Sequence, residues 1–314
     1  MKNDVTIFGI VLNLPIVAII GNLQIISYIQ KIKQELEVSI PGFKLVDNKN
    51  NLKVTWFLNI KESKTSNAFY KIDDNVIYLE LEGELELITV NIWIDLFKNI
   101  ASYSLLNAGL FLIDASINLI NNKAIMFCGW PGSGKAAAAY QLSSQGYPII
   151  SSKTCLVDKD FNVIVGTQKI QLTQHCIKKY FQEIDNKSNS SKLTDYISVR
   201  ENNKSIKQNR DYQSKKEKII SIYHLRIQDK TVGVTEISQY RKRLVISSHV
   251  ISRQVCRPII IGPWEIVLLL NNNIINYSSL QKIINAMANI QQYQLYSNPK
   301  DLKTIIENTN EKYC

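Results

Sequence analysis

The chain has 314 residues, of which 45% are hydrophobic and 20% charged, so it can bury either one large core or two smaller ones. Its 37 Lys and Arg exceed its 27 Asp and Glu, and the net charge of +10 favours anionic partners without choosing among nucleotides, nucleic acid, acidic peptides and lipid headgroups. The five cysteines and three histidines are scattered, which argues against a disulfide framework, a zinc site or a histidine base and favours a reducing, cytoplasmic location.

The first part of the chain is predicted to be rich in strands. Residues 5–21 are apolar, but Asn13 and Pro15 interrupt them, so we expect two short buried strands around an Asn-Leu-Pro turn instead of a membrane span. Strands or extended segments are further expected over residues 38–46, 52–60, 68–72 and 75–82, and helices over 23–36 and 93–108. We therefore predict a β-rich N-terminal region over residues 1–104 with one or two helices.

Residues 105–314 are predicted to form an α/β domain with a mixed sheet. A buried strand over residues 110–120 turns at Asn121-Asn122-Lys123 into a strand over 124–128. The later strands are expected over residues 148–151, 155–158, 162–165, 219–227, 231–237 and 292–296, and the helices over 135–145, 176–184, 238–249, 278–290 and 299–308. Residues 185–218 are dense in Asn, Ser, Lys and Asp, which predicts an exposed, mobile, basic insertion.

The segment between the strand over 124–128 and the helix over 135–145 carries the clearest motif. Gly129-Trp-Pro-Gly-Ser-Gly-Lys135 matches the G-x-x-x-x-G-K pattern of a phosphate-binding P-loop. Glycines let backbone N–H groups converge on phosphate oxygens, the lysine adds a positive charge, and the helix contributes the positive end of its dipole. The motif predicts a site for ATP or another nucleoside triphosphate, and a glycine-rich turn without a ligand is the alternative. The predicted binding residues are Gly129, Trp130, Pro131, Gly132, Ser133, Gly134, Lys135 and Ala136.

Ala136 departs from this motif at the position where a Ser or Thr hydroxyl normally holds magnesium. We therefore expect magnesium binding to be weakened or absent and predict no metal site. Loss of one aligned electrostatic contact typically costs about 3 kcal/mol, or roughly a hundredfold in rate, so phosphoryl transfer is expected to be impaired.

The order of segments around the loop resembles the HPr kinase/phosphorylase-like family, including the kinase-like proteins found beside ribosomal peptide biosynthesis genes. The resemblance rests on Leu112-Ile-Asp-Ala-Ser116 before the loop and Ile149-Ile-Ser-Ser-Lys153 after it, with weaker matches near residues 170–172, 219–223 and 293–302. It extends over residues 105 to 310. It implies a kinase-like core, ATP as ligand, oligomer formation, and phosphate transfer to a serine of a peptide or protein.

The departures from that family fall on its chemistry. The resemblance assigns the catalytic positions to Asp114, Lys135, Ser152 and Lys153, but Asp114 stands where the family has histidine, and Ser152 and Lys153 stand where it has two acidic residues. A serine hydroxyl needs a positioned base to take its proton, and neither replacement is a good one. Lys153 either balances phosphate charge beside Lys135 without a metal or is an exposed turn lysine.

Three functions follow from these features. The first is a degenerate kinase-like protein that binds a peptide or protein partner, with weak nucleotide binding. The second is a working ATP-dependent phosphotransferase that acts on a peptide or protein serine with unusual groups. The third and least favoured is nucleic-acid binding, because a single tyrosine, Tyr212, accompanies its basic residues. These are Lys204, Lys207, Arg210, Lys215, Lys216, Lys218, Arg241, Lys242 and Arg243.

Overall fold

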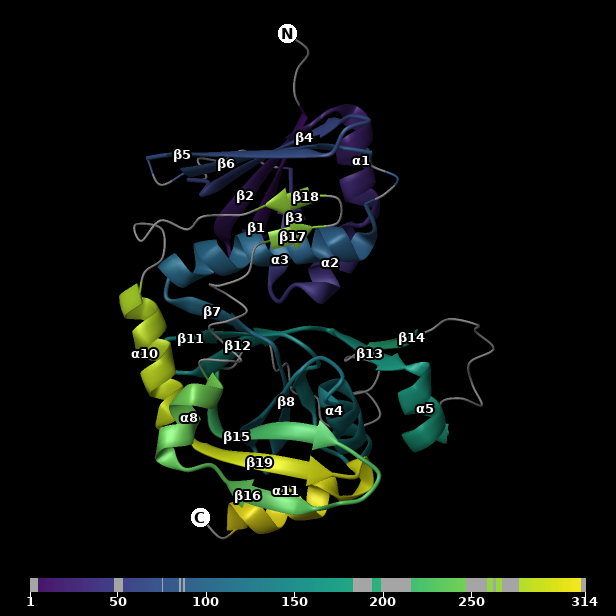
Figure 1. The fold of residues 1–314 in the computed structure, drawn as a ribbon, viewed down its shortest axis with the longest axis vertical. Coiled ribbons are helices and arrows are strands. Elements are labelled where there is room, and N and C mark those ends of the chain that lie inside the picture. Colours follow the sequence, from purple (N-terminus) through teal and green to yellow (C-terminus); the bar gives the residue numbers. More distant parts are fainter. Residues whose placement is uncertain are drawn as a thin grey trace. The chain divides into compact units, whose positions relative to one another are not determined.

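The structure is a computed structural model that describes residues 5–47, 53–74, 76–84, 86, 88–182, 194–198, 216–246, 259–261, 264–266 and 277–311. These residues form mixed α/β structure with eight α-helices and mixed sheets (Figure 1). The chain divides into two compact units, which we call the first unit (Met1–Leu112 with Ile251–Gln281) and the second unit (Ile113–Val250 with Lys282–Cys314). The boundary predicted at residue 104 lies close to this division, but residues 251–281 belong to the first unit and not to the second.

The first unit contains a six-stranded sheet with the strand order β3-β1-β2-β4-β6-β5. The strands are β1 (Val5–Val11), β2 (Leu14–Gly21), β3 (Phe43–Val46), β4 (Trp56–Glu62), β5 (Asn67–Asp73) and β6 (Val76–Gly83). Strands β1 and β2 form an antiparallel hairpin that turns at Leu12 and Asn13, where φ is 49° and 66°. The apolar segment is thus a pair of strands, as predicted. Among the described residues, no helix is long and apolar enough to cross a membrane.

The helices of the first unit are α1 (Leu23–Lys31), α2 (Lys33–Ser39) and α3 (Val90–Asn107), and Figure 1 shows α2 and α3 on the same side of the sheet. The single helix predicted over residues 23–36 is wrong, because Ile32 leaves the helical conformation between α1 and α2. This break keeps both Ile32 and Leu36 buried while the chain changes direction. The extended segment predicted over 38–46 consequently starts only at Phe43.

Aromatic side chains fasten α3 to this sheet. Phe97 lies 5.6 Å from Phe43 of β3, and Tyr103 lies 6.0 Å from Trp56 of β4, measured between ring centroids. All four are buried. Such pairs combine a large buried apolar area with a preferred ring geometry, so they fix the position of the helix on the strands.

Four further elements lie in the segments through which the chain leaves and re-enters the first unit. The passage to the second unit falls within β7 (Leu110–Ile113), and the chain comes back to the first unit for the antiparallel pair β17 (Ile259–Ile261) and β18 (Trp264–Ile266). The final return to the second unit falls within α10 (Tyr277–Ala288). The strand predicted over residues 110–120 is therefore two strands, because the backbone leaves the extended ladder at Asp114.

The second unit is built around a mixed sheet. Its path runs β10-β8-β9-β15-β12-β11, with β19 beside β15 and β16 beside β19. The strands are β8 (Ala115–Ile120), β9 (Lys123–Cys128), β10 (Ile149–Ser151), β11 (Cys155–Asp158), β12 (Asn162–Gly166), β15 (Glu217–Ile227), β16 (Gly233–Glu236) and β19 (Gln291–Ser297). The predicted turn joins β8 to β9, with positive φ at both Asn121 and Asn122. Strands β9, β15 and β19 are mutually parallel, so their carboxyl ends lie at one edge of the sheet.

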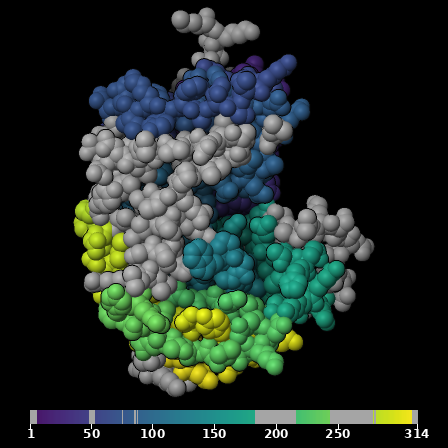
Figure 2. All heavy atoms as spheres, viewed as in Figure 1, coloured from purple at the N-terminus to yellow at the C-terminus, as the bar shows by residue number. Residues whose placement is uncertain are grey.

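An aromatic row keeps these three parallel strands in register. The ring of Tyr223 on β15 stacks at 5.9 Å on Phe127 of β9 and at 5.0 Å on Tyr293 of β19. In Figure 2, yellow atoms of the C-terminal segment are visible between green atoms of the segment that ends at residue 246. The row determines which loops meet at the carboxyl edge of the sheet.

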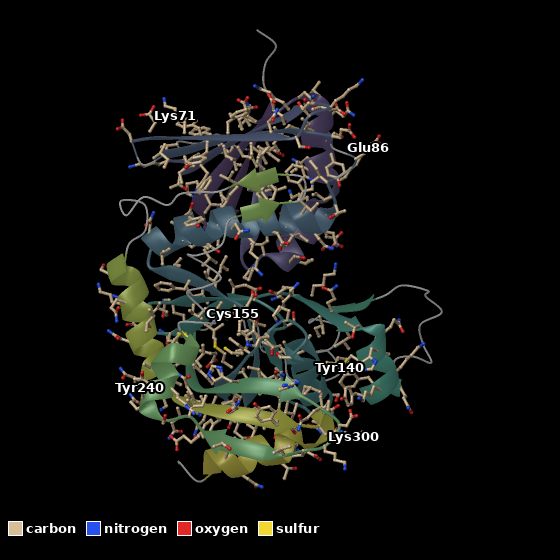
Figure 3. All side chains as sticks on the ribbon, viewed as in Figure 1. Lys71, Glu86, Tyr140, Cys155, Tyr240 and Lys300 are labelled. Carbon is tan, nitrogen blue, oxygen red and sulfur yellow. The ribbon has the colours of Figure 1, made fainter. Side chains whose placement is uncertain are left out.

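The helices of the second unit include α4 (Lys135–Ser144), α5 (Gln174–Tyr180), α8 (Gln239–Ile246) and α11 (Leu302–Glu311), the last preceded by the 3₁₀ turn η3 (Pro299–Asp301). Helix α5 starts two residues earlier than expected and ends at Tyr180. Tyr140 of α4, labelled in Figure 3, makes an edge-to-face contact with Phe181 just after α5, with 5.0 Å between ring centroids. Helix α5 is thereby packed against the helix that follows the predicted P-loop.

The insertion predicted over residues 185–218 is wrong in part. Residues 194–198 form strand β14 (Thr194–Ser198), which pairs with β13 (Lys169–Thr173), and β15 already begins at Glu217. The average composition of the segment is polar, but residues 194–198 include Thr, Tyr and Ile, which favour strands. Residues 185–193 and 199–215 of the predicted insertion lie outside the described residues.

Candidate functional site

The predicted loop joins β9 to α4 in the second unit, in the strand–loop–helix order that the sequence indicates. Gly129 ends the strand against the neighbouring β15: a Cβ there would lie 2.8 Å from the carbonyl oxygen of Leu225 and 2.3 Å from Ser133 Oγ. Gly134, with φ of 94°, has similarly little room, because a Cβ would lie 2.3 Å from Ile227 Cγ1. The glycines are thus needed to fold the loop tightly over the end of β15.

Hydrogen bonds hold the loop in this shape. The Ile227 N–H donates to the carbonyl of Ser133 at 2.8 Å, and the Ser133 N–H donates to the carbonyl of Trp130 at 3.0 Å. The ammonium of Lys135 reaches back to the carbonyl oxygens of Gly129 at 2.6 Å and Trp130 at 3.2 Å. A phosphate that attracts the ammonium would compete with these loop carbonyls.

The base of the helix is fixed as well. Ser116 Oγ on β8 donates to the carbonyl of Lys135 at 2.9 Å, and the Ala138 N–H donates to the carbonyl of Gly134 at 2.9 Å. The first N–H groups of an α-helix have no partner within the helix and carry its positive dipole end. The start of α4 is therefore suited to an anion.

A cavity of about 870 Å³ opens beside the loop. Its walls come from the loop and α4, from Ser152 and Lys153 after β10, from β13 with α5, and from the segment between β15 and β16. The lining residues are Pro131, Gly132, Gly134, Lys135, Ala136, Ala137, Ser152, Lys153, Gln171, Leu172, Thr173, His175, Cys176, Lys179, Tyr180, Ile227, Gln228, Asp229 and Lys230. A cavity of this volume falls in the range of small-molecule sites, and its size accommodates more than a phosphate chain.

Positive charge dominates the cavity wall. Four lysines line it, Lys135, Lys153, Lys179 and Lys230, while Asp229 is the one carboxylate among its lining residues. Counting these four lysines and the one aspartate, the wall carries three net positive charges. A concave wall with one sign of charge concentrates oppositely charged ligands, so this cavity favours anions.

Asp229 ties α5 to the segment that follows β15. Its carboxylate accepts a short hydrogen bond from Lys179 Nζ and one of 3.0 Å from Tyr180 Oη. The bond from Lys179, followed by that from Tyr180, lowers the pKa of Asp229, and the bond to Asp229 raises the pKa of Lys179. Both groups are therefore charged at neutral pH. The Asn298 side chain after β19 also donates to the Asp229 carbonyl, at 3.0 Å.

The structure separates the predicted catalytic residues. Lys135, Ser152 and Lys153 line the cavity, but Asp114 is not among the lining residues and its carboxylate accepts a hydrogen bond of 3.1 Å from Thr154 Oγ1. Ser152 is buried and its hydroxyl donates to the Lys169 carbonyl at 2.5 Å. The Ser152 oxygen is thus held in the fold as a donor, while Lys153 is exposed at the cavity.

The predicted binding residues divide in a similar way. Pro131, Gly132, Gly134, Lys135 and Ala136 line the cavity, whereas the other three predicted residues shape the loop behind it. Among those three, Trp130 is 59% exposed, and the hydroxyl of Ser133 is buried without a hydrogen-bond partner among the described residues.

The sequence did not indicate the α5 wall or the charged residues after β15. His175, Cys176, Lys179, Asp229 and Lys230 all line the cavity, and no site role was expected for the histidine. A signal existed for the last pair, because Asp229 and Lys230 follow a predicted strand and ligands gather at the carboxyl ends of parallel strands. That β15 lies beside β9 was not readable from the sequence.

The loop lacks the hydroxyl that would hold magnesium at the start of α4. This cation prefers oxygen ligands from carboxylates, hydroxyls and water. Ala136 offers a methyl group, the Ser152 hydroxyl donates to a backbone carbonyl, and the Asp229 carboxylate accepts hydrogen bonds from α5. Among the residues that the structure describes, no group of three or more acidic, cysteine or histidine side chains could hold a metal.

The two cysteines nearest the loop are not thiolates. Burial raises the pKa of Cys128, directly before the loop, to about 12. Burial also raises the pKa of Cys176, in the cavity wall, to about 11. Both thiols are therefore neutral near pH 7, and neither is activated as a nucleophile.

The residues considered for nucleic-acid binding are described only in part. Lys216 pairs with Asp158 at 3.3 Å, and Lys242 is only 7% exposed. Four others, Lys204, Lys207, Arg210 and Lys215, lie outside the described residues.

Two comparisons with known proteins found no relative of this chain. A scan against protein-family models found no match to the chain, and a search of curated proteins found none either. The interpretation of the site consequently rests on its own geometry and chemistry.

Proposed function

We propose that the second unit binds a nucleoside triphosphate such as ATP, with the phosphates at the loop from Gly129 to Lys135. The observation that carries this proposal is the loop itself, folded by its glycines at the start of α4 and opening on a cavity with three net positive charges. Lys135 and the first N–H groups of α4 would hold the phosphates. The rest of the cavity, including Leu172, Cys176 and Tyr180, offers apolar surface for the nucleoside.

We further propose that the protein is a degenerate member of the HPr kinase/phosphorylase-like group that acts by binding a peptide or protein partner. Three features support impaired chemistry: Ala136 has no hydroxyl, the Ser152 hydroxyl is engaged as a donor, and Asp114 bonds with Thr154 away from the cavity lining. None of these groups is suited to take a proton from a serine hydroxyl. A short peptide that contains serine is the first class of partner to test.

Calorimetric titration of the full chain with ATP tests the nucleotide site. Replacing Lys135→Met should weaken binding about 10- to 100-fold, because a hydrogen bond to a charged group contributes about 1.5–3 kcal/mol. Lys159→Met is the matched control, since Lys159 is exposed in the turn between β11 and β12 and does not line the cavity. ATP binding that is equal in the Lys135 variant and the wild type would refute a phosphate site at the loop.

A working phosphotransferase is the second candidate, and Asp229 is the observation that favours it. This carboxylate lines the same cavity and is ionised at neutral pH, so it could accept a proton once Lys179 and Tyr180 release it. Incubation with labelled ATP and serine-containing peptides decides between the two proposals. Phosphate transfer by the wild type that is lost in both Lys135→Met and Asp229→Asn would establish a phosphotransferase. It would overturn the proposal of a degenerate kinase-like protein.

A further inference from the structure

We propose that this cavity takes its nucleoside polyphosphate as the free anion, with lysines in place of a divalent cation. The inference rests on the proposed function and adds the ionic form of the ligand. The positive charges of the cavity wall come from four separate elements. Lys135 begins α4, Lys153 follows β10, Lys179 lies on α5 and Lys230 follows β15.

This distribution matters because polyphosphates carry charge along their length. In magnesium-dependent sites, the cation bridges neighbouring phosphates and neutralises part of that charge. Here, ammonium groups from several walls can approach different phosphates, as point charges on flexible stems. A magnesium complex is less negative than the free nucleotide, so a wall with three net positive charges attracts the complex less strongly.

Two of the oxygen atoms that could attract a cation, Ser152 Oγ and Asp229 Oδ1, take part in hydrogen bonds. The Ser152 hydroxyl donates to the Lys169 carbonyl at 2.5 Å, and Asp229 accepts from Lys179 and Tyr180. A cation at Asp229 Oδ1 would compete with the ammonium of Lys179. An incoming phosphate is instead attracted by Lys179 and by the three other lysines of the cavity wall.

The experiment is a titration of the full chain with ATP at constant ionic strength, once in EDTA and once in excess magnesium. Binding should be tighter in EDTA. Lys153→Met and Lys230→Met should each weaken binding in EDTA by roughly two- to fivefold, the range expected for exposed charge pairs. Lys159→Met is the control and should leave the affinity unchanged. Ala136→Ser, which restores a hydroxyl at the start of α4, should shift the preference toward magnesium.

The outcomes separate the two proposals. Binding in magnesium alone would overturn the free-anion inference and leave the nucleotide site standing. Binding in EDTA with the Lys153 and Lys230 variants indistinguishable from the Lys159 control would also overturn it, because the charge would then come from elsewhere. An absence of ATP binding in both buffers would refute the nucleotide site itself, and the inference with it.

Discussion

Replacing Gly134 with alanine should destabilise the second unit more than the same change at Gly132, although both glycines lie in the loop with positive φ. At Gly132, φ is 82° and a Cβ meets no atom within 4 Å, so alanine meets only the unfavourable backbone conformation. At Gly134, φ is 94° and a Cβ would lie 2.3 Å from Ile227 Cγ1 and 2.6 Å from Ile227 Cβ. The pair therefore separates backbone strain from steric overlap within one loop.

The expected magnitudes follow from these two contributions. A left-handed conformation costs a non-glycine residue about 1–2 kcal/mol, which is the whole loss expected for Gly132→Ala. Overpacking adds about 1–3 kcal/mol, so Gly134→Ala should lose about 2–5 kcal/mol in total. Ile227→Ala in the Gly134→Ala background should recover part of the difference, because it removes Cγ1 and retains Cβ.

Urea unfolding followed by circular dichroism measures the free energies, and hydrogen exchange in α4 reports the second unit by itself. The predicted result is faster hydrogen exchange in α4 and a lower unfolding midpoint for Gly134→Ala than for Gly132→Ala. Equal losses in the two variants would show that the loop does not press against Ile227, and the tight fold described for it would be refuted.

Three further predictions concern other positions. Burial opposes ionisation of Asp158, but hydrogen bonds, led by those from Asn162, outweigh it and lower its pKa. Asp158→Asn should therefore lower the free energy of unfolding by about 1–2 kcal/mol at neutral pH, as urea unfolding can measure. This difference should shrink below about pH 4, where the carboxyl of the unfolded chain is protonated. Because burial raises the pKa of Cys176 to about 11, its alkylation by iodoacetamide should be slow at pH 7, accelerate up to pH 11, and slow again when ATP fills the cavity, as peptide mass spectrometry can check. Asn22 accepts a hydrogen bond from the Ile25 N–H at 2.9 Å at the start of α1, so Asn22→Ala should lower the stability of the first unit by about 1 kcal/mol, and an unchanged midpoint would contradict this cap.

Local rules were sufficient wherever neighbouring residues decide the structure. The hairpins at Asn13 and at Asn121-Asn122 were predictable because asparagine tolerates positive φ, and the loop at Gly129 was predictable because its glycines precede a good helix former. The failures have local causes too. Apolar spacing could not show that Ile32 breaks a helix, and average composition concealed the strand within residues 194–198.

The sequence by itself determined that residues 123–144 form a strand, a tight glycine loop and a helix, because spacing and backbone freedom are properties of the chain. Only the tertiary structure decided what faces that loop. The parallel pairing of β9 and β15 brings Asp229 and Lys230 to the cavity, and the contact of Tyr140 with Phe181 helps hold α5 and Lys179 at its wall. Pairing between strands far apart in the chain depends on packing across the whole sheet, which no local pattern encodes.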